Sequence, residues 1–252
     1  MKRIKHILFA GALMAAAPAF ASSETAMPYK FEPDTGNEAS LQRGARNFMN
    51  YCSGCHSMRH MRYGRVGQDL GIPEDLMQAN LMFTSKKPGD HILSAMPADA
   101  EQWFGKQPPD LTVETRMRGP EWVYNYLMTF YLDPSRPAGT NNLMLPGASM
   151  PHVLGELQGW QVMETAHAEE GAAAAEAHGG AHAGPGFTLV SKGSLDEKEY
   201  EKFVADTVNF MVYTAEPGRN GRISLGIKVM LYLLVLTGLF YLLKREFWKE
   251  VH

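Results

Sequence analysis

The only two cysteines of the chain, Cys52 and Cys55, stand three positions apart, and His56 follows the second one directly. This C-x-x-C-H pattern is the covalent attachment signature of a c-type haem. Two thiols at this spacing reach the two vinyl groups of one porphyrin, and the adjacent histidine then serves as the proximal ligand of the iron. The pattern therefore predicts a domain folded around one covalently bound haem c, with no cysteine left for a disulfide.

Two other kinds of site also use closely spaced cysteines. A thioredoxin-type redox pair normally follows a strand within a βαβ pattern, whereas Cys52 comes at the end of a helical pattern. A structural zinc site needs further ligands at suitable spacing, and the sequence holds no second cysteine pair. A chance occurrence is the third alternative, and the haem interpretation is favoured over all three.

The N-terminal segment predicts export from the cytoplasm. Residues 1–6 carry three cations, residues 7–20 form an alanine-rich apolar run, and Ala19-Phe20-Ala21 offers a cleavage site. Together these are the parts of a secretory signal peptide, with an uncleaved anchor as the alternative. Cleavage would remove three cations and no carboxylate, so the formal net charge would change from −3 to −6.

A second apolar run, residues 223–243, is long enough to cross a bilayer. Its 21 residues include one charge, Lys228, near the start, and a helix of that length spans roughly 31 Å. Lys228 can extend to the interface, and Trp248 is a suitable interfacial aromatic residue. The run predicts a transmembrane helix rather than a buried core helix.

These two ends organise the chain into four parts. They are a signal peptide at 1–21, a haem domain at 22–221, a transmembrane anchor at 222–244 and a tail at 245–252. The signal peptide directs the haem domain outward. We therefore expect a single-pass protein of a bacterial inner membrane, with the haem domain in the periplasm and the tail in the cytoplasm.

Most apolar positions between these ends recur at helical spacing. One stripe at i, i+4, i+7, i+8 and i+11 consists of Leu41, Ala45, Phe48, Met49 and Cys52. It predicts an amphipathic helix that delivers the haem motif at its C-terminal end. A second helix is predicted over 121–132, after Pro120 and before Asp133-Pro134. A third begins with a capping box at Ser194–Glu197 and ends at Glu216-Pro217-Gly218.

One segment, residues 167–186, does not belong to a packed core. It contains alanine, glycine, histidine and glutamate but no aromatic or branched apolar residue. Such a segment cannot bury enough surface to offset its ordering entropy. We predict a solvated flexible insertion, with a metal site formed by its histidines, His167, His178 and His182, as the disfavoured alternative.

The iron needs either a sixth ligand or an open distal face. Methionine is the usual sixth ligand in electron carriers, because its thioether favours Fe(II). Met96 and Met150 stand out because a proline follows each, which suits an extended loop. Met150 is preferred, since it follows the turn-rich residues 145–149. The alternatives are Met96, ligation by His91 or His152, and an open site for peroxidase or gas-sensing chemistry. His60 is too close to His56 to reach the opposite face.

Several further motifs resemble, in order, the cytochrome c1 family, the haem subunits of the quinol–cytochrome c oxidoreductase. The matching stretches are Arg43-Gly44, residues 52–58, Pro108-Pro109-Asp110-Leu111, Arg116 and Arg118, Met150-Pro151 and Ala215-Glu216-Pro217. The resemblance covers nearly the whole mature chain. The ordered set with a C-terminal anchor is much more specific than C-x-x-C-H alone.

The resemblance implies a mainly α fold: a cytochrome c-like haem domain with one C-terminal transmembrane helix. It implies His56 and Met150 as the axial ligands of the iron. Pro108 and Pro109 would pack beside the haem, and Arg118 would pair with a propionate, since a guanidinium suits bidentate carboxylate recognition. A surface helix cap is the alternative role for Arg118.

The resemblance also implies outer-sphere electron transfer, with no catalysis by this chain alone. The electron would come from the Rieske iron–sulfur protein and pass to a soluble or anchored c-type cytochrome. The anchor would pack on the cytochrome b subunit in the membrane, and nucleic acid is not an expected partner. The alternatives are an anchored cytochrome that feeds a terminal oxidase, and a haem peroxidase or sensor.

Overall fold

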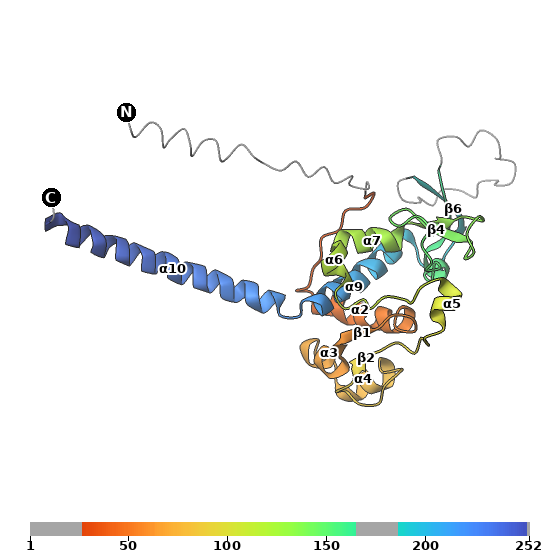
Figure 1. Cartoon of the computed structure of the whole chain (residues 1–252), viewed down its shortest axis with the longest axis horizontal. Helices are drawn as coiled ribbons and strands as arrows, with labels where there is room; N and C mark the ends of the chain where they lie inside the picture. Colours follow the sequence, from red (N-terminus) through yellow and green to blue (C-terminus); the bar gives the residue numbers. More distant parts are fainter. Residues whose placement is uncertain (1–26, 165–185, 251–252) are drawn as a thin grey trace.

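The computed structural model describes residues 27–164 and 186–250, and Figure 1 shows their arrangement. The predicted signal peptide lies outside the described residues. So does the predicted insertion at 167–186, apart from Gly186. Both assignments therefore stay predictions.

Helices dominate the described part of the chain. They are α2 (Glu38–Tyr51), α3 (Tyr63–Asp69), α4 (Glu74–Asn80), α5 (Ala100–Phe104), α6 (Glu114–Arg118), α7 (Pro120–Met128), α8 (Gly155–Gln158), α9 (Glu197–Ala215), α10 (Arg219–Phe247) and a 3₁₀ turn (Trp248–Glu250). Three antiparallel strand pairs accompany them: β1 (Met58–Arg62) with β2 (His91–Ile92), β3 (Phe130–Leu132) with β4 (Thr140–Asn142), and β5 (Gly159–Met163) with β6 (Phe187–Lys192). The mainly α prediction is confirmed.

The core forms where α9 packs against α2, α6 and α7 (Figure 1). Phe48 of α2 and Phe210 of α9 are both completely buried, and their ring centroids lie 5.9 Å apart. Gly44 allows the two helices to approach closely, because a Cβ atom there would lie 2.0 Å from the Asp206 carbonyl oxygen. Only glycine fits at this crossing.

A partly buried ion pair joins the same two helices one residue earlier. Arg43 Nε lies 2.6 Å from Asp206 Oδ2, and Arg43 Nη2 lies 2.9 Å from Oδ1. Ser40 Oγ also donates to Asp206 Oδ1, at 2.5 Å. Such a bidentate pair is among the stronger charge-assisted contacts. The adjacent residues Arg43 and Gly44 thus serve one helix crossing.

The predicted helix at 121–132 is wrong in its last turn. Helix α7 ends at Met128, and Phe130–Leu132 form strand β3. The strand pairs with β4, and its Phe130 carbonyl accepts a hydrogen bond from Gln161 Nε2 at 2.7 Å. These partners lie further along the chain, so the local aromatic pattern could not reveal them.

The start of α9 also differs from the prediction. The N-cap is Asp196 rather than Ser194: Asp196 Oδ1 accepts from the Glu199 N–H, and Glu199 Oε2 accepts from the Asp196 N–H. The Ser194 N–H instead donates to the carbonyl of Glu156, in α8, at 2.9 Å. Because Ser194 is bonded to α8, the N-cap of α9 lies two residues later than predicted. The predicted end of α9 at Glu216 is confirmed.

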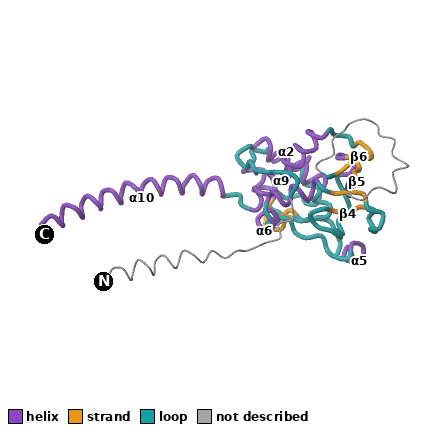
Figure 2. The backbone as a smooth tube through the Cα atoms, turned by 90° about the horizontal axis from the view of Figure 1, so that it is seen from above, coloured by secondary structure: helices purple, strands orange, loops and turns teal. Residues whose placement is uncertain are grey.

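Helix α10 projects away from the rest of the described residues (Figures 1 and 2). It is the one helix in the described ranges that is long and apolar enough to cross a membrane, and its side chains are exposed all round. The predicted anchor at 222–244 lies inside it. The structure thus carries a C-terminal helix that fits a membrane anchor.

Candidate haem site

The haem motif follows directly from α2. Burial of Leu41, Ala45 and Phe48 fixes which face of the helix meets the core, and Cys52 is the C-cap residue. The chain then closes a tight turn, in which the His56 N–H donates to the Cys52 carbonyl at 2.8 Å. This turn brings both cysteines and the histidine to the same end of the helix, as the sequence predicts.

A largely apolar cavity opens beside this turn. Its walls come from the end of α2, the segment before α6, helices α6, α7 and α9, and the loop between β4 and α8. Every predicted site residue lines it: Cys52, Cys55, His56, Pro108, Pro109, Arg118 and Met150. Predicted site residues as far apart in the sequence as Cys52 and Met150 therefore line one cavity.

His56 is held in one tautomer by a backbone group. Its Nδ1 lies 2.8 Å from the carbonyl oxygen of Pro109. A carbonyl can only accept, so Nδ1 carries the proton and Nε2 keeps its lone pair. Burial lowers the pKa of His56, although the bond to Pro109 and nearby carboxylates oppose this. A neutral imidazole with a free Nε2 is the form that binds a metal.

The Pro-Pro-Asp-Leu segment is fastened to the residues that follow the haem motif. Asp110 Oδ2 accepts from the Arg59 N–H at 2.7 Å, and Oδ1 accepts from Thr112 Oγ1 at 2.6 Å. The Leu111 N–H donates to the Ser57 carbonyl at 2.9 Å. Burial raises the pKa of Asp110, but the hydrogen bonds from Thr112 and Arg59 outweigh it, so the pKa is lowered. The segment thereby holds the Pro109 carbonyl under His56.

Arg118 forms an ion pair within α6 and also lines the cavity. Its Nε donates to Glu114 Oε1 at 2.6 Å, one turn earlier in α6, and its guanidinium carbon lies 4.3 Å from the Trp122 ring centroid. The pair with Glu114 uses Nε and leaves both Nη atoms for another acceptor. A propionate contact from this wall of the cavity is therefore compatible with the helix pair.

The methionine and histidine candidates separate clearly. Met150 lines the cavity with His56, whereas the alternatives Met96, His60, His91 and His152 do not. His152 is buried elsewhere, with its ring stacked on Phe130 at a centroid distance of 5.0 Å. The geometry therefore favours Met150 over the other predicted distal ligands.

One wall of the cavity is aromatic, and its residues were not predicted from the sequence. Trp122 and Tyr126 of α7 both line the cavity and stack on each other, with centroids 5.3 Å apart and an interplanar angle of 12°. Phe203 and Met211 of α9 contribute as well. The four-residue spacing of Trp122 and Tyr126 was the available signal, since it places both side chains on one face of α7.

The two thiols do not have the chemistry of a redox pair. Burial raises the pKa of Cys52 to about 12 and also raises that of Cys55. Redox-active pairs instead have lowered thiol pKa values. Within residues 27–164 and 186–250, no group of three or more histidine, cysteine or acidic side chains could hold a metal ion. The raised pKa values do not support the redox interpretation, and the described residues offer no further ligands for a zinc site.

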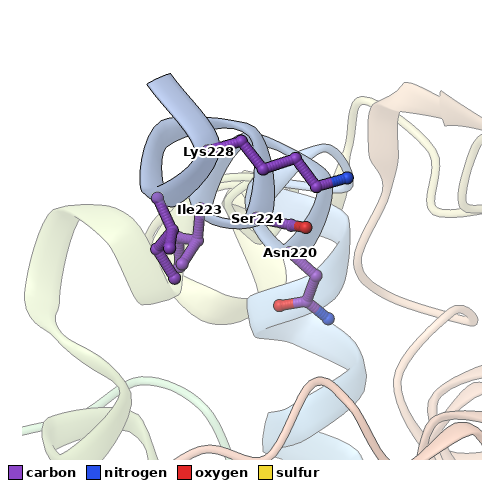
Figure 3. Close-up of a pocket in the computed structure, with 5 residues that line it drawn as sticks. Asn220, Ile223, Ser224 and Lys228 are labelled. Atoms are coloured by element: carbon purple, nitrogen blue, oxygen red, sulfur yellow. The ribbon is translucent and has the colours of Figure 1, made fainter. Parts of the chain in front are cut away.

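A second hollow lies at the start of α10 and shares no lining residue with the haem cavity. It is shallow and is lined by Asn220, Ile223, Ser224, Ile227 and Lys228 (Figure 3). Asn220 already donates to the Thr35 carbonyl at 3.0 Å. Its lining contains neither a cysteine nor a histidine, so this hollow is not a haem site.

Known proteins resemble the chain over most of its length. The profile of the Cytochrome C1 family matches residues 29–251. A cytochrome c1 from Allochromatium vinosum is 50% identical over 222 residues, which cover 87% of each chain. The ammonia monooxygenase gamma subunit of Nitrosomonas europaea is 42% identical over 100% of both chains. Among solved structures, a chain of a hyperthermophilic respiratory Complex III covers 100% of this chain and 99% of its own length, with 17% identity and a TM-score of 0.47.

The family profile spans residues 29–251, a range that includes the haem motif, every residue that lines the cavity, and α10. The chain therefore belongs to the cytochrome c1 family, whose members carry a covalently bound c-type haem.

Proposed function

We propose that the chain is the membrane-anchored haem subunit of a quinol–cytochrome c oxidoreductase and relays single electrons. The observation that carries this proposal is the shared cavity of Cys52, Cys55, His56 and Met150, in a chain of the cytochrome c1 family.

The cavity residues fit a covalent haem. Two thiols at the end of one turn can form thioethers, and His56 already has the tautomer that leaves Nε2 as a ligand. Met150 supplies a thioether, and the apolar wall suits a porphyrin face. When bound, the haem supplies a metal centre that changes its oxidation state by one electron.

The residues of the chain then have distinct tasks. Cys52 and Cys55 would hold the haem covalently, and His56 and Met150 would donate to its iron. Thioether donation favours the ferrous state and raises the reduction potential. With His56 and Met150 both as donors to the iron, no site would remain for a substrate. The chain is therefore an electron-transfer subunit rather than an enzyme by itself.

Helix α10 indicates the contacts of the chain within the membrane. Its exposed apolar side chains fit lipid and a neighbouring transmembrane subunit, for which we propose cytochrome b. The Rieske iron–sulfur protein is the proposed donor, and a soluble or anchored c-type cytochrome is the acceptor. The haem domain would lie in the periplasm of a bacterium and the C-terminal tail in its cytoplasm.

Purification from membranes through a tag on this chain tests the assembly. We expect two b-type haems, an iron–sulfur signal and quinol-dependent reduction of a c-type cytochrome in the purified fraction. Recovery with a terminal oxidase, or with the other subunits of an ammonia monooxygenase, and without b-type haem would contradict the proposal. The second outcome matters because of the relative from Nitrosomonas europaea.

A further inference from the structure

We propose that Asn142 and His152 are positioning residues that fasten the two ends of the loop carrying Met150. This inference rests on the proposed function, because it assumes that Met150 is the distal ligand. It extends that function by naming the side chains that keep the thioether at the iron.

Asn142 fastens the start of the loop. Its side chain is completely buried at the end of β4, where Nδ2 donates to the Tyr126 carbonyl at 2.7 Å. Its Oδ1 accepts from the N–H groups of Met144 at 2.9 Å and Leu145 at 3.2 Å. Tyr126 and Leu145 both line the cavity. A single amide therefore ties the first loop residues to the cavity wall.

A second set of bonds shapes the loop just before Met150. The Gly147 N–H donates to Asn141 Oδ1 at 2.7 Å, and the Gly147 carbonyl accepts from Arg136 Nη2 at 3.0 Å. Gly147 has a φ of 80°, a conformation that favours glycine. The chain thus turns at a fixed point three residues ahead of the proposed ligand.

His152 fastens the other end by packing. Its ring is 8% exposed and lies parallel to Phe130, with an interplanar angle of 9°. It also meets the edge of Trp160 at a centroid distance of 5.6 Å. Its Nε2 has no hydrogen-bond partner among the described residues. The ring is therefore held by aromatic packing, which does not require a hydrogen bond through Nε2.

Asn142 and the residue on which His152 stacks form one register pair of the β3–β4 hairpin. Phe130, on which His152 stacks, is the direct register partner of Asn142 in the β3–β4 pair. The loop consequently leaves the hairpin at Asn142 and returns to it at Phe130. Closing the loop at one rung restricts the positions open to Met150, because short closed loops have few conformations.

The test uses the full-length haem-loaded protein in detergent and reads the iron directly. A ferric iron with a thioether ligand gives a weak far-red charge-transfer band, and an occupied distal position excludes carbon monoxide from the ferrous form. We expect Asn142→Ala and His152→Ala to lose most of this band, to bind carbon monoxide and to have lower reduction potentials. His152→Phe should retain the wild-type band, because it keeps the stacked ring.

Asn125→Ala is the matched control. Asn125 is also completely buried and makes three hydrogen bonds through its amide, to both backbone groups of Tyr29 and to the Glu121 carbonyl. It does not line the haem cavity. This variant should lose a comparable amount of stability and keep the band, which separates positioning from general destabilisation.

The outcomes separate this inference from the function on which it rests. A wild-type protein that lacks the band and binds carbon monoxide would refute Met150 ligation itself. If haem-loaded Asn142→Ala and His152→Ala keep the wild-type band, only the positioning role is overturned. The same conclusion follows if the Asn125→Ala control loses as much of the band as these two variants do. If Asn142→Ala does not retain haem, Asn142→Asp keeps an acceptor for the loop N–H groups, removes the donor to Tyr126 and places a buried carboxylate against that carbonyl; a full band there would overturn the role of Asn142.

Discussion

At the scale of single residues, the haem site depends on side chains that hold backbone groups of distant segments. His56 is bonded to the carbonyl of Pro109, 53 positions away. Asp110 accepts from the backbone of Arg59, 51 positions away. Each contact ties the haem motif to a loop that local sequence alone could not fix. Removing one such group should therefore loosen a whole segment.

Asp110→Asn should lower the free energy of unfolding by roughly 1–2 kcal/mol at neutral pH, because an amide offers one acceptor oxygen in place of two. The pKa of Asp110 is lowered in the folded protein, so its carboxylate stabilises the fold at pH values above the unfolded-state pKa of about 3.9. That contribution disappears as the pH falls through the pKa of the folded state. Denaturant titrations should show the gap between wild type and variant shrinking below about pH 4. A gap that widens with acid would contradict this account.

Gly44→Ala should cost about 3 kcal/mol of stability, because the added Cβ would meet the backbone of α9 rather than a flexible side chain. Thermal or denaturant unfolding of the haem-loaded protein measures this loss. Gly89→Ala is the control, since a Cβ there would meet nothing within 4 Å. Equal stability of the two variants would show that α2 and α9 do not cross as closely as described.

At the scale of elements, the sequence predicts those parts whose signals are local. The stripe from Leu41 to Cys52 predicted α2, and the Glu216-Pro217 break predicted the end of α9. The sequence could not reveal β3, because its partner β4 lies after a turn. Nor could it identify Asn142, whose bond to the Tyr126 carbonyl joins residues 16 positions apart. The site residues came from motifs, but the aromatic wall on α7 needed the structure.

The link between β5 and β6 offers a test at this scale. Met163 and Phe187 are register partners, and the Glu164 N–H donates to the Gly186 carbonyl at 2.9 Å. The hairpin ends are therefore already joined. Replacing residues 167–184 by a short Gly/Ser bridge should leave the haem absorption spectrum unchanged. An altered spectrum would instead revive the histidines of this segment as ligands.

At the scale of the whole molecule, the haem cavity and the apolar helix are separate structures. None of the residues that line the haem cavity comes from α10. The first turn of α10 is nevertheless attached to the haem domain, because Glu216 accepts from Arg116 Nη1 at 3.4 Å and is also paired with Arg222. The anchor therefore sets where the haem domain sits, without contributing to its iron site.

Truncation after Gly218 should consequently release a haem domain that is soluble without detergent. Its haem should remain covalently attached, and its absorption spectrum should match that of the full-length protein. Ultracentrifugation of the expressed fragment, followed by spectra of the supernatant, checks this. Loss of haem from the fragment would show that the division into haem domain and anchor is wrong.

Carbon monoxide binding to the ferrous full-length protein at neutral pH tests the central claim most directly. With His56 and Met150 filling both axial positions, the wild-type spectrum should not change on addition of the gas. Met150→Leu keeps the side-chain volume but removes the sulfur, so it should bind carbon monoxide, whereas Met96→Leu should behave as wild type. Carbon monoxide binding by the unmodified protein would contradict the electron-carrier account and indicate an enzyme or sensor with an open iron site.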